Sequence, residues 1–283
     1  MTFFLAQGGG ASVGWFEFLF APERWSWLFS GRSFVFLLEG LAVNLEMAVI
    51  AMVLSLILGL LLALGRISKT PALSWTAGAW IDVWRNLPLI FILLYLALGL
   101  PDGLNSAWES AAPEWLPEAF KSGRIVAAIG GLTLYNSAVF AEIMRAGIQS
   151  LERGQGEAAA ALGLPYWKSM RLVILPQGLR RMVPATVSQL ITLNKDTTLA
   201  FIIGFQEVGR HGRILASCQP FTCGVTIPFL QVFLVIGAMF ILVNFALSRL
   251  SKRLEIKQRE RTGVVVERAT GLEDQLAAEA DVA

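Results

Sequence analysis

The sequence has few of the residues that build disulfide-stapled or metal-binding proteins. It contains 2 cysteines and 1 histidine among 283 residues. Two cysteines cannot staple a fold of this size, which excludes a disulfide scaffold. A single histidine, His211, leaves no cluster with the ligand spacing of a metal site. The phosphate-binding pattern GxxxxGK(S/T) is also absent, so we expect no ATP bound through such a loop.

Charge is scarce as well. Charged residues make up 16% of the chain and hydrophobic residues 55%, whereas an ordinary soluble domain is about 25% charged. This composition excludes a disordered or collagen-like chain. The 23 Lys and Arg nearly balance the 21 Asp and Glu, so the net charge gives no reason to expect a nucleic-acid partner. A soluble protein of this length would need charged faces, and long stretches here have none.

The charge-poor stretches predict about five membrane-spanning helices. A span needs about 20 mostly apolar residues, because the hydrocarbon core is about 30 Å thick. The segments that meet this requirement are residues 41–65, 79–101, 125–141, 182–205 and 228–247. Lys195 and Asp196 interrupt the fourth of them. We therefore expect an all-α, polytopic membrane protein that lies in a lipid bilayer.

The N-terminal segment has a different composition. Aromatic residues mix with charges in residues 12–36, a pattern that suits the headgroup region. We interpret this segment as interfacial, with a sixth span as the alternative. The first residues do not resemble a signal peptide, since they lack a basic region and glycines 8–10 interrupt the apolar run. The expected organisation is an extracellular or interfacial segment 1–38, a transmembrane domain 39–249 and a cytoplasmic tail 250–283.

The loops between the five predicted spans carry unequal numbers of Lys and Arg. One set of loops holds fifteen: Arg66, Lys69, Arg145, Arg153, Lys168, Arg171, Arg180, Arg181, Arg249, Lys252, Arg253, Lys257, Arg259, Arg261 and Arg268. The other set holds six: Arg24, Arg32, Lys121, Arg124, Arg210 and Arg213. Cytoplasmic loops carry the excess of basic residues. The bias predicts an N-terminus outside and a C-terminus in the cytoplasm.

The longest predicted internal loop, residues 145–181, has the local chemistry of a helix–turn–helix. The run 157–162, EAAAAL, is rich in strong helix formers. Gly163 suits a helix C-terminus, and Pro165 suits the first turn of a second short helix. Pro176 is expected to end or kink that second helix. Its apolar residues are Tyr166, Trp167, Met170 and Leu172. Unless a partner protein covers them, they would form an exposed hydrophobic patch.

The same loop carries a known spacing. Glu157-Ala158-Ala159, then Gly163, then Val173-Ile174-Leu175-Pro176 resembles the EAA loop of ATP-binding-cassette (ABC) importer permeases, EAA-x3-G-x9-I-x-L-P, with Val173 in place of Ile. Further segments are similar to permeases of the polar amino acid uptake (histidine/glutamine/glutamate-type) family: residues 85–88 (RNLP), 141–145 (AEIMR), 154–159 (GQGEAA), 161–163 (ALG), 175–177 (LPQ) and 195–199 (KDTTL). Departures from that family are Asn86-Leu87 for Gly-Thr, Val139 for Tyr and Asn44 for Thr.

The resemblance implies a fold, a partner and a set of contact residues. The fold is that of type I ABC importer permeases, in which the short helix of the loop docks in a cleft of a cytosolic ATPase subunit. The residues expected at that contact are Glu157, Ala158, Ala159, Gly163, Pro165, Tyr166, Trp167 and Arg171. ATP and Mg²⁺ would bind in that partner, so we expect this chain to hold no cofactor and to be no enzyme. A solvated helical hairpin without a partner is the alternative.

Polar and charged residues inside the predicted spans are candidates for a substrate pathway. An ionisable group at mid-bilayer costs at least about 2.5 kcal/mol, so it normally faces a cavity or a partner. The candidates are Asn194, Lys195, Asp196, Thr197, Thr198, Arg85 and Glu142. Lys195 could meet a substrate carboxylate and Asp196 an ammonium; the alternative is an interhelical ion pair that holds the bundle. Arg85 and Glu142 could snorkel or pair with each other.

These observations predict the permease subunit of an ABC importer for a polar amino acid, in a bacterial cytoplasmic membrane. The favoured substrates are glutamate, glutamine and aspartate. A self-contained secondary transporter or channel is the alternative, although no internal inverted repeat is found. The expected partners are two cytosolic ABC ATPases, a second identical or paralogous permease, and an extracytoplasmic amino-acid-binding protein that meets outer loops 101–124 and 206–226. Cys218 and Cys223 form a local disulfide or stay free thiols.

Overall fold

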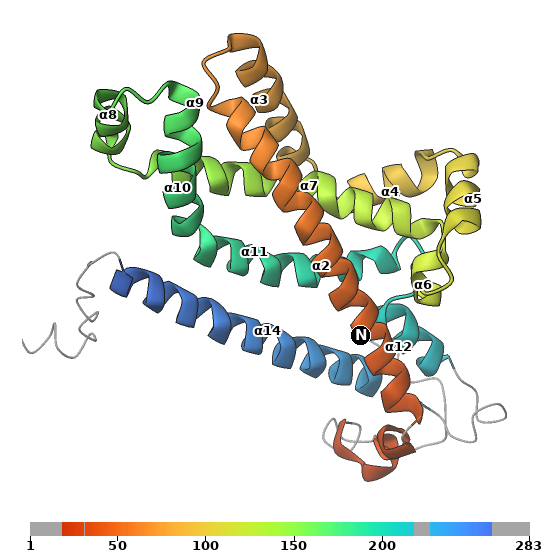
Figure 1. The fold of residues 1–283 in the computed structure, drawn as a ribbon. Helices are drawn as coiled ribbons and strands as arrows, with labels where there is room; N and C mark the ends of the chain where they lie inside the picture. Colours follow the sequence, from red (N-terminus) through yellow and green to blue (C-terminus); the bar gives the residue numbers. More distant parts are fainter. Residues whose placement is uncertain (1–18, 31, 218–226, 262–283) are drawn as a thin grey trace, which may run out of the picture.

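A computed structural model describes residues 19–30, 32–217 and 227–261 (Figure 1). Within these ranges every regular element is a helix. Two short 3-10 helices, η1 (Pro22–Arg24) and η2 (Ser26–Ser30), precede α2 (Arg32–Arg66). The chain then forms α3 (Pro71–Asn86), α4 (Leu89–Gly99), α5 (Asp102–Ala111), α6 (Glu118–Lys121), α7 (Arg124–Gln149), α8 (Arg153–Ala161), α9 (Tyr166–Ser169), η3 (Met170–Ile174), α10 (Leu175–Arg181), α11 (Val183–Asp196), η4 (Thr197–Phe201), α12 (Val208–Ala216) and α14 (Phe229–Arg261). Cys218, Cys223 and residues 262–283 of the predicted tail lie outside the described residues.

Three helices in the described ranges are long and apolar enough to cross a membrane: Arg32–Arg66, Arg124–Gln149 and Phe229–Lys257. They coincide with the first, third and fifth predicted spans and run beyond the predicted apolar segments. α2 begins at Arg32. Residues 32–36 therefore belong to the same helix as the first predicted span, and the predicted boundary at residue 38 falls inside that helix.

The second predicted span, residues 79–101, is not one straight helix. α3 and α4 qualify as a span only as a pair, and the two helices meet at an angle of 99°. Leu87, between them, is extended with φ −88° and ψ 132°. Pro88 disfavours the helical conformation of the residue before it and has no N–H to donate. Pro88 thus breaks the predicted span into two helices.

The fourth predicted span, residues 182–205, is also irregular. α11 has 14 residues and passes directly into the 3-10 helix η4. The hydroxyl groups of Thr197 and Thr198 bond back to the carbonyls of Asn194 and Lys195, each at 2.7 Å. Such local bonds compete with the regular helical ladder. This stretch is not among the straight or bent spans of the described residues, which number three or, with the α3–α4 pair, four.

The core forms where α2 crosses α7, and small residues allow the close approach. A Cβ added at Gly59 of α2 would lie 2.9 Å from the Phe140 Cβ and from the Ser137 carbonyl oxygen of α7. Figure 1 shows α2 running across α7, with α11 and α14 side by side. Small residues at such crossings are typical of membrane helices, which gain little from hydrophobic exclusion of water. This crossing positions the polar residues described next.

Candidate functional site

The predicted coupling loop forms a helix–turn–helix at one end of the molecule (Figure 1). α8 ends in a turn in which the Gly163 N–H donates to the Ala160 carbonyl at 2.9 Å and the Leu164 N–H to the Ala159 carbonyl at 3.1 Å. Gly163 has φ +74°. This pair of bonds is the usual glycine-terminated helix end, and a left-handed conformation costs other L-residues about 1–2 kcal/mol. Pro165 then precedes α9.

The turn presents an apolar surface to its surroundings. Trp167 and Leu172 are 62% and 63% exposed, and Tyr166 is 46% exposed. Most of the predicted contact residues are exposed as well, namely Glu157, Ala158, Gly163, Pro165, Tyr166, Trp167 and Arg171. Ala159 differs, because it is buried at 3% exposed. The Ala159 side chain is therefore not part of the exposed surface of the loop.

The sequence predicted that Pro176 would end or kink the second helix. In the structure the helix does not end at Pro176. η3, a π-helical segment, continues α9 directly into α10, and Pro176 lies in the first turn of α10. A proline inside a helical run frees one carbonyl of the preceding turn, and a local π-helical segment such as η3 is one way to satisfy it again. Gly178 of α10 then packs closely on α7, since a Cβ added to it would lie 3.0 Å from the Ile148 Cα. An unbroken run of helix thus joins the exposed α9 to α7.

The first internal loop also reaches this helix. The Lys69 Nζ lies 4.9 Å from the centre of the Tyr166 ring, within the range of a cation–π contact. Lys69 belongs to the connection between α2 and α3. The coupling loop is therefore in contact with both the end of α2 and the end of α7.

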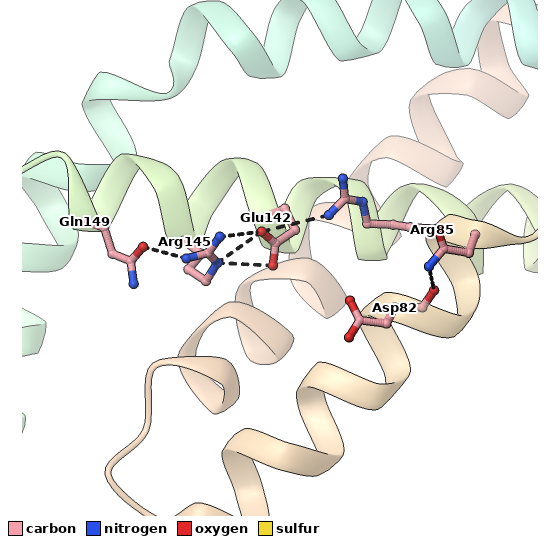
Figure 2. A network of polar contacts seen from close by, with 6 residues as sticks. Asp82, Arg85, Glu142, Arg145 and Gln149 are labelled. Carbon is pink, nitrogen blue, oxygen red and sulfur yellow. Dashed lines mark hydrogen bonds and ion pairs between the residues drawn. The ribbon is translucent and has the colours of Figure 1, made fainter.

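Arg85 and Glu142 pair with each other, which was one of the two sequence alternatives (Figure 2). The Arg85 guanidinium of α3 lies 3.9 Å from the Glu142 carboxylate of α7. Arg145, one turn further along α7, donates to the same carboxylate at 2.7 Å and to the Gln149 side chain at 2.5 Å. Glu142 thus has two arginine partners from two helices, and the network joins the C-terminal half of α7 to the end of α3.

The polar residues around α11 are held mainly by neutral hydrogen bonds. The Asn194 amide donates to the Asn244 side chain of α14 at 3.1 Å. The Gln189 amide donates to the Asn136 side chain of α7 at 2.9 Å. Hydrogen bonds of this kind between membrane helices are worth about 0.6 kcal/mol on average. Amide pairs therefore place α11 between its two neighbours without the use of ionised groups.

Lys195 and Asp196 do not form the interhelical ion pair that was one of the alternatives, at least in the described part of the chain. No oppositely charged group lies within 4.0 Å of either side chain there. Lys195 is exposed and Asp196 is half-buried, whereas Asn194 and Thr197 are buried. Of the five candidates in residues 194–198, two therefore belong to the packed interior, and Lys195 is directed away from it.

A comparison with known families decides the class of protein. Residues 39–260 match the family described as the inner membrane component of binding-protein-dependent transport systems. The chain belongs to this family. The matched range begins within α2 and ends within α14, so the family's conserved unit includes both the coupling loop and the polar segment after α11.

Relatives of this transport family carry amino-acid permease names. The chain is 35% identical to the probable glutamine ABC transporter permease protein GlnP of Bacillus subtilis, over 81% of this chain and 97% of that one. It is 36% identical to the glutamate/aspartate import permease protein GltK of Escherichia coli, over 63% and 76%. It is 33% identical to the arginine transport system permease protein ArtQ of Bacillus subtilis, over 78% and 92%.

Solved structures share the permease fold. A crystal structure of an amino acid ABC transporter with histidines superposes with a TM-score of 0.64 at 27% identity, covering 82% of this chain and 97% of that one. The inward-facing methionine ABC transporter MetNI shares the fold at a TM-score of 0.56 and 20% identity, over 80% and 99%. The permease is thus an all-helical integral membrane protein of the ABC importer fold.

Sequence reasoning missed one polar cluster of this permease. Glu207 lies buried between η4 and α12, in contact with Asn44 of α2. Asn44 was noted only as a departure from the family pattern, and Glu207 was not singled out. A signal was present, because Glu207 is the one charged residue in the stretch 197–209. A lone carboxylate in such a stretch is expected to have a specific partner.

Proposed function

We propose that this chain is the membrane-spanning permease subunit of an ATP-driven importer for a polar amino acid in a bacterial cytoplasmic membrane. The observation that carries the proposal is an exposed, glycine-terminated helix–turn–helix with the EAA spacing, on a chain of the binding-protein-dependent transport family. The permease names of its relatives include glutamine, glutamate/aspartate and arginine. Glutamine, glutamate and aspartate are the substrates that we propose.

The exposed loop is proposed to dock on a cytosolic ATPase. Trp167 and Leu172 supply a large apolar surface, and Arg171 and Glu157 supply charge beside it. Aromatic and arginine anchors surrounded by polar residues are typical of protein interfaces. Closure of two ATPase subunits around ATP and Mg²⁺ would move α9, and the unbroken helical run η3–α10 would carry that movement to α7.

The rest of the complex follows from the same proposal. A second permease, identical or paralogous, would complete a pathway with two-fold symmetry. An amino-acid-binding protein would meet the outer loops, around residues 101–124 and 206–226. Lys195, Asp196 and Thr198 are the proposed substrate-facing residues of the segment, since Asn194 and Thr197 are buried. Arg85 and Glu142 have a structural partnership and are proposed to hold α3 on α7.

Uptake into proteoliposomes tests the proposal. The chain would be reconstituted with its ATPase, second permease and binding protein, and labelled glutamine, glutamate, aspartate, arginine and histidine would be supplied in turn. We expect uptake of one or more acidic or amide amino acids that requires ATP, the ATPase and the binding protein together. Uptake that persists without ATP or without the ATPase would instead identify a secondary transporter or channel.

A pair of variants tests the docking surface within the same assay. Glu157→Lys reverses an exposed charge of the loop and should abolish substrate-stimulated ATP hydrolysis while the protein still inserts in the membrane. Glu152→Lys, an exposed carboxylate at the start of α8 outside the proposed contact residues, is the matched control and should hydrolyse ATP normally. Equal hydrolysis by the two variants would contradict the coupling role of Glu157.

A further inference from the structure

A buried hydrogen-bond cluster joins the outer helix α12 to the span α2. Glu207, Asn44 and Thr197 are each fully buried, with 0% of their surface exposed. The Asn44 amide group donates to the Thr197 hydroxyl at 2.9 Å and to the Glu207 carboxylate at 3.3 Å. Its carbonyl oxygen accepts from the Val208 N–H at 3.0 Å. One side chain of α2 thus bridges η4 and the start of α12.

The face of α2 around Asn44 is fitted closely to α12. A Cβ added at Gly40, one turn before Asn44, would lie only 2.7 Å from the Val208 Cα and 2.7 Å from the His211 Nδ1. One turn further back, the Phe36 ring stacks on the His211 ring with 4.1 Å between centroids. The Phe36 carbonyl oxygen lies 2.8 Å from the His211 Nδ1. Residues four apart share one face of a helix, so these three α2 positions form a continuous docking stripe.

The Glu207 carboxylate makes this arrangement specific to one position of α12. A buried carboxylate is costly unless several hydrogen bonds satisfy it. The backbone N–H groups of Gly209 and Arg210 donate to it from within α12. The Asn44 amide supplies a further donor from another helix. A shift of α12 away from α2 would therefore remove a donor from a buried carboxylate and break two of the three hydrogen bonds of the Asn44 side chain, those to Glu207 and Val208.

We propose that Asn44 and Glu207 are positioning residues that hold α12 on α2 and, through Thr197, fix the polar segment at the end of α11. The Thr197 hydroxyl, which accepts from Asn44, donates in turn to the Asn194 carbonyl at 2.7 Å. The inference rests on the proposed function, because residues 194–198 hold the pathway candidates and α12 lies in an outer loop expected to meet the binding protein. Displacement of α12 by that partner would reach the pathway residues through this cluster.

The hydrogen bond between Asn44 and Glu207 is tested by exchanging the amide and the carboxylate between the two positions. Glu207→Gln turns amide hydrogens toward the Asn44 amide, and Asn44→Asp places a second carboxylate beside Glu207. Each single variant therefore loses the bond between the two side chains. The double variant N44D/E207Q restores that bond with donor and acceptor reversed and leaves the net charge of the chain unchanged. The Thr197 hydroxyl, which accepts from Asn44 in the native chain, would then donate to the new carboxylate. Glu46→Gln, which neutralises an exposed carboxylate on α2 two residues from Asn44, is the matched control.

The first measurement needs no partner protein. Amide hydrogen–deuterium exchange is followed in the segment Val208–Ala216 of the full chain in lipid nanodiscs. We expect about tenfold faster exchange in each single variant, because a hydrogen bond to a charged group is lost, and exchange near the wild-type rate in the double variant and in Glu46→Gln. A single variant that fails to insert also supports the pair if the double variant inserts at the wild-type level. Thr197→Val, which removes only the hydroxyl bridge, provides a milder third variant with faster exchange expected.

The second measurement is ATP-dependent uptake of labelled glutamine, glutamate and aspartate by the reconstituted complex. We expect each single variant to lose about tenfold or more of the uptake and the double variant to recover most of it. Unchanged exchange in both singles and in Thr197→Val would overturn the contact. Faster exchange with unchanged uptake would overturn the positioning role. A wild-type complex without ATP-dependent uptake would contradict the proposed function. The hydrogen–deuterium exchange measurement would still decide whether Asn44 and Glu207 hold α12.

Discussion

At the scale of single residues, Gly163 is the clearest link between conformation and coupling. Its φ of +74° is available to glycine at little cost, whereas alanine there would lose about 1–2 kcal/mol. We expect Gly163→Ala to insert normally and to disorder the turn before α9, so that less substrate is transported for each ATP hydrolysed. The measurement is the ratio of ATP hydrolysed to amino acid imported.

Gly154 provides the control for this prediction. It lies in the first turn of α8 with a helical φ, and a Cβ added to it meets nothing within 4 Å. Alanine also favours a helix by about 1 kcal/mol over glycine. Gly154→Ala should therefore leave the ratio at its wild-type value. A Gly163→Ala variant with the same ratio as Gly154→Ala would show that the turn geometry does not matter for coupling.

Lys195 gives a second prediction at this scale. Since no carboxylate lies within 4.0 Å of its ammonium group among the described residues, removal of that charge breaks no ion pair there. We expect Lys195→Met to reach the wild-type level in the membrane and to lose most ATP-dependent uptake. Lys252→Met, at an exposed lysine of α14, should change neither quantity. A low membrane level of Lys195→Met that Asp196→Leu restores in the double variant would instead indicate an ion pair.

The residue-scale predictions show where sequence reasoning works. The spacing of Glu157, Gly163 and Pro165 anticipated a turn, because glycine permits the left-handed conformation that ends a helix and proline fixes φ at the start of the next one. The Asn44–Glu207 contact could not be anticipated in this way, since 163 residues separate the two side chains in the chain. Nothing in the local pattern says which distant amide satisfies a buried carboxylate. The burial of Ala159 beside exposed Ala158 is likewise set by packing.

At the scale of helices, the crossing of α2 and α7 depends on the size of one residue. Gly59 leaves no room for a side chain, because an added Cβ would lie 2.9 Å from the Phe140 Cβ. We expect Gly59→Val to separate the two helices and to lower the free energy of unfolding by about 1–3 kcal/mol, the usual cost of an overpacked core. The measurement is thermal unfolding of the purified protein in detergent.

Gly237 of α14 is the matched position for the same substitution. It is also inside a long apolar helix, but a Cβ added there meets nothing within 4 Å. Gly237→Val should therefore unfold close to the wild-type temperature. Equal stability of the Gly59→Val and Gly237→Val proteins would contradict the close crossing of α2 and α7.

Helix existence was easier to predict than helix shape. Apolar runs identified the three long helices, because a lipid-exposed backbone must satisfy its own hydrogen bonds. The bend of 99° between α3 and α4 was not foreseen, although Pro88 was visible in the sequence. A proline within an apolar run permits either a mild kink or a sharp break. In the structure α4 packs against α7 beyond this break.

At the scale of the whole molecule, the contacts sort the loops into two opposite ends. Lys69 of the first internal loop meets Tyr166 of the second, and Ser251 near the end of α14 meets Ser188 at the start of α11. At the other end, the Arg124 guanidinium donates to the Gly204 carbonyl, which brings the start of α7 to the segment before α12. Figure 1 shows α8 and α9 far from α5, α6 and α12.

This sorting matches the division of loops on which the count of Lys and Arg was based. In the described part of the chain, the segments predicted to be internal gather at the end that carries α8 and α9. The charge bias predicts that this end faces the cytoplasm, since basic loops remain on the cytoplasmic side.

Cysteine labelling tests the resulting topology, with the N-terminus outside. Gly103→Cys in α5 and Gly154→Cys in α8 are introduced after Cys218 and Cys223 are replaced by serine, and neither new side chain meets an atom within 4 Å. A membrane-impermeant maleimide should label position 103 in intact spheroplasts and position 154 only after the membrane is opened. Cysteines at Gly9 and Gly263 should behave like positions 103 and 154, respectively. The opposite pattern would invert the orientation and place α9 where no cytosolic ATPase could reach it. Labelling from outside at both 103 and 154 would require a different division of the loops, and with it a different number of spans between α5 and α8.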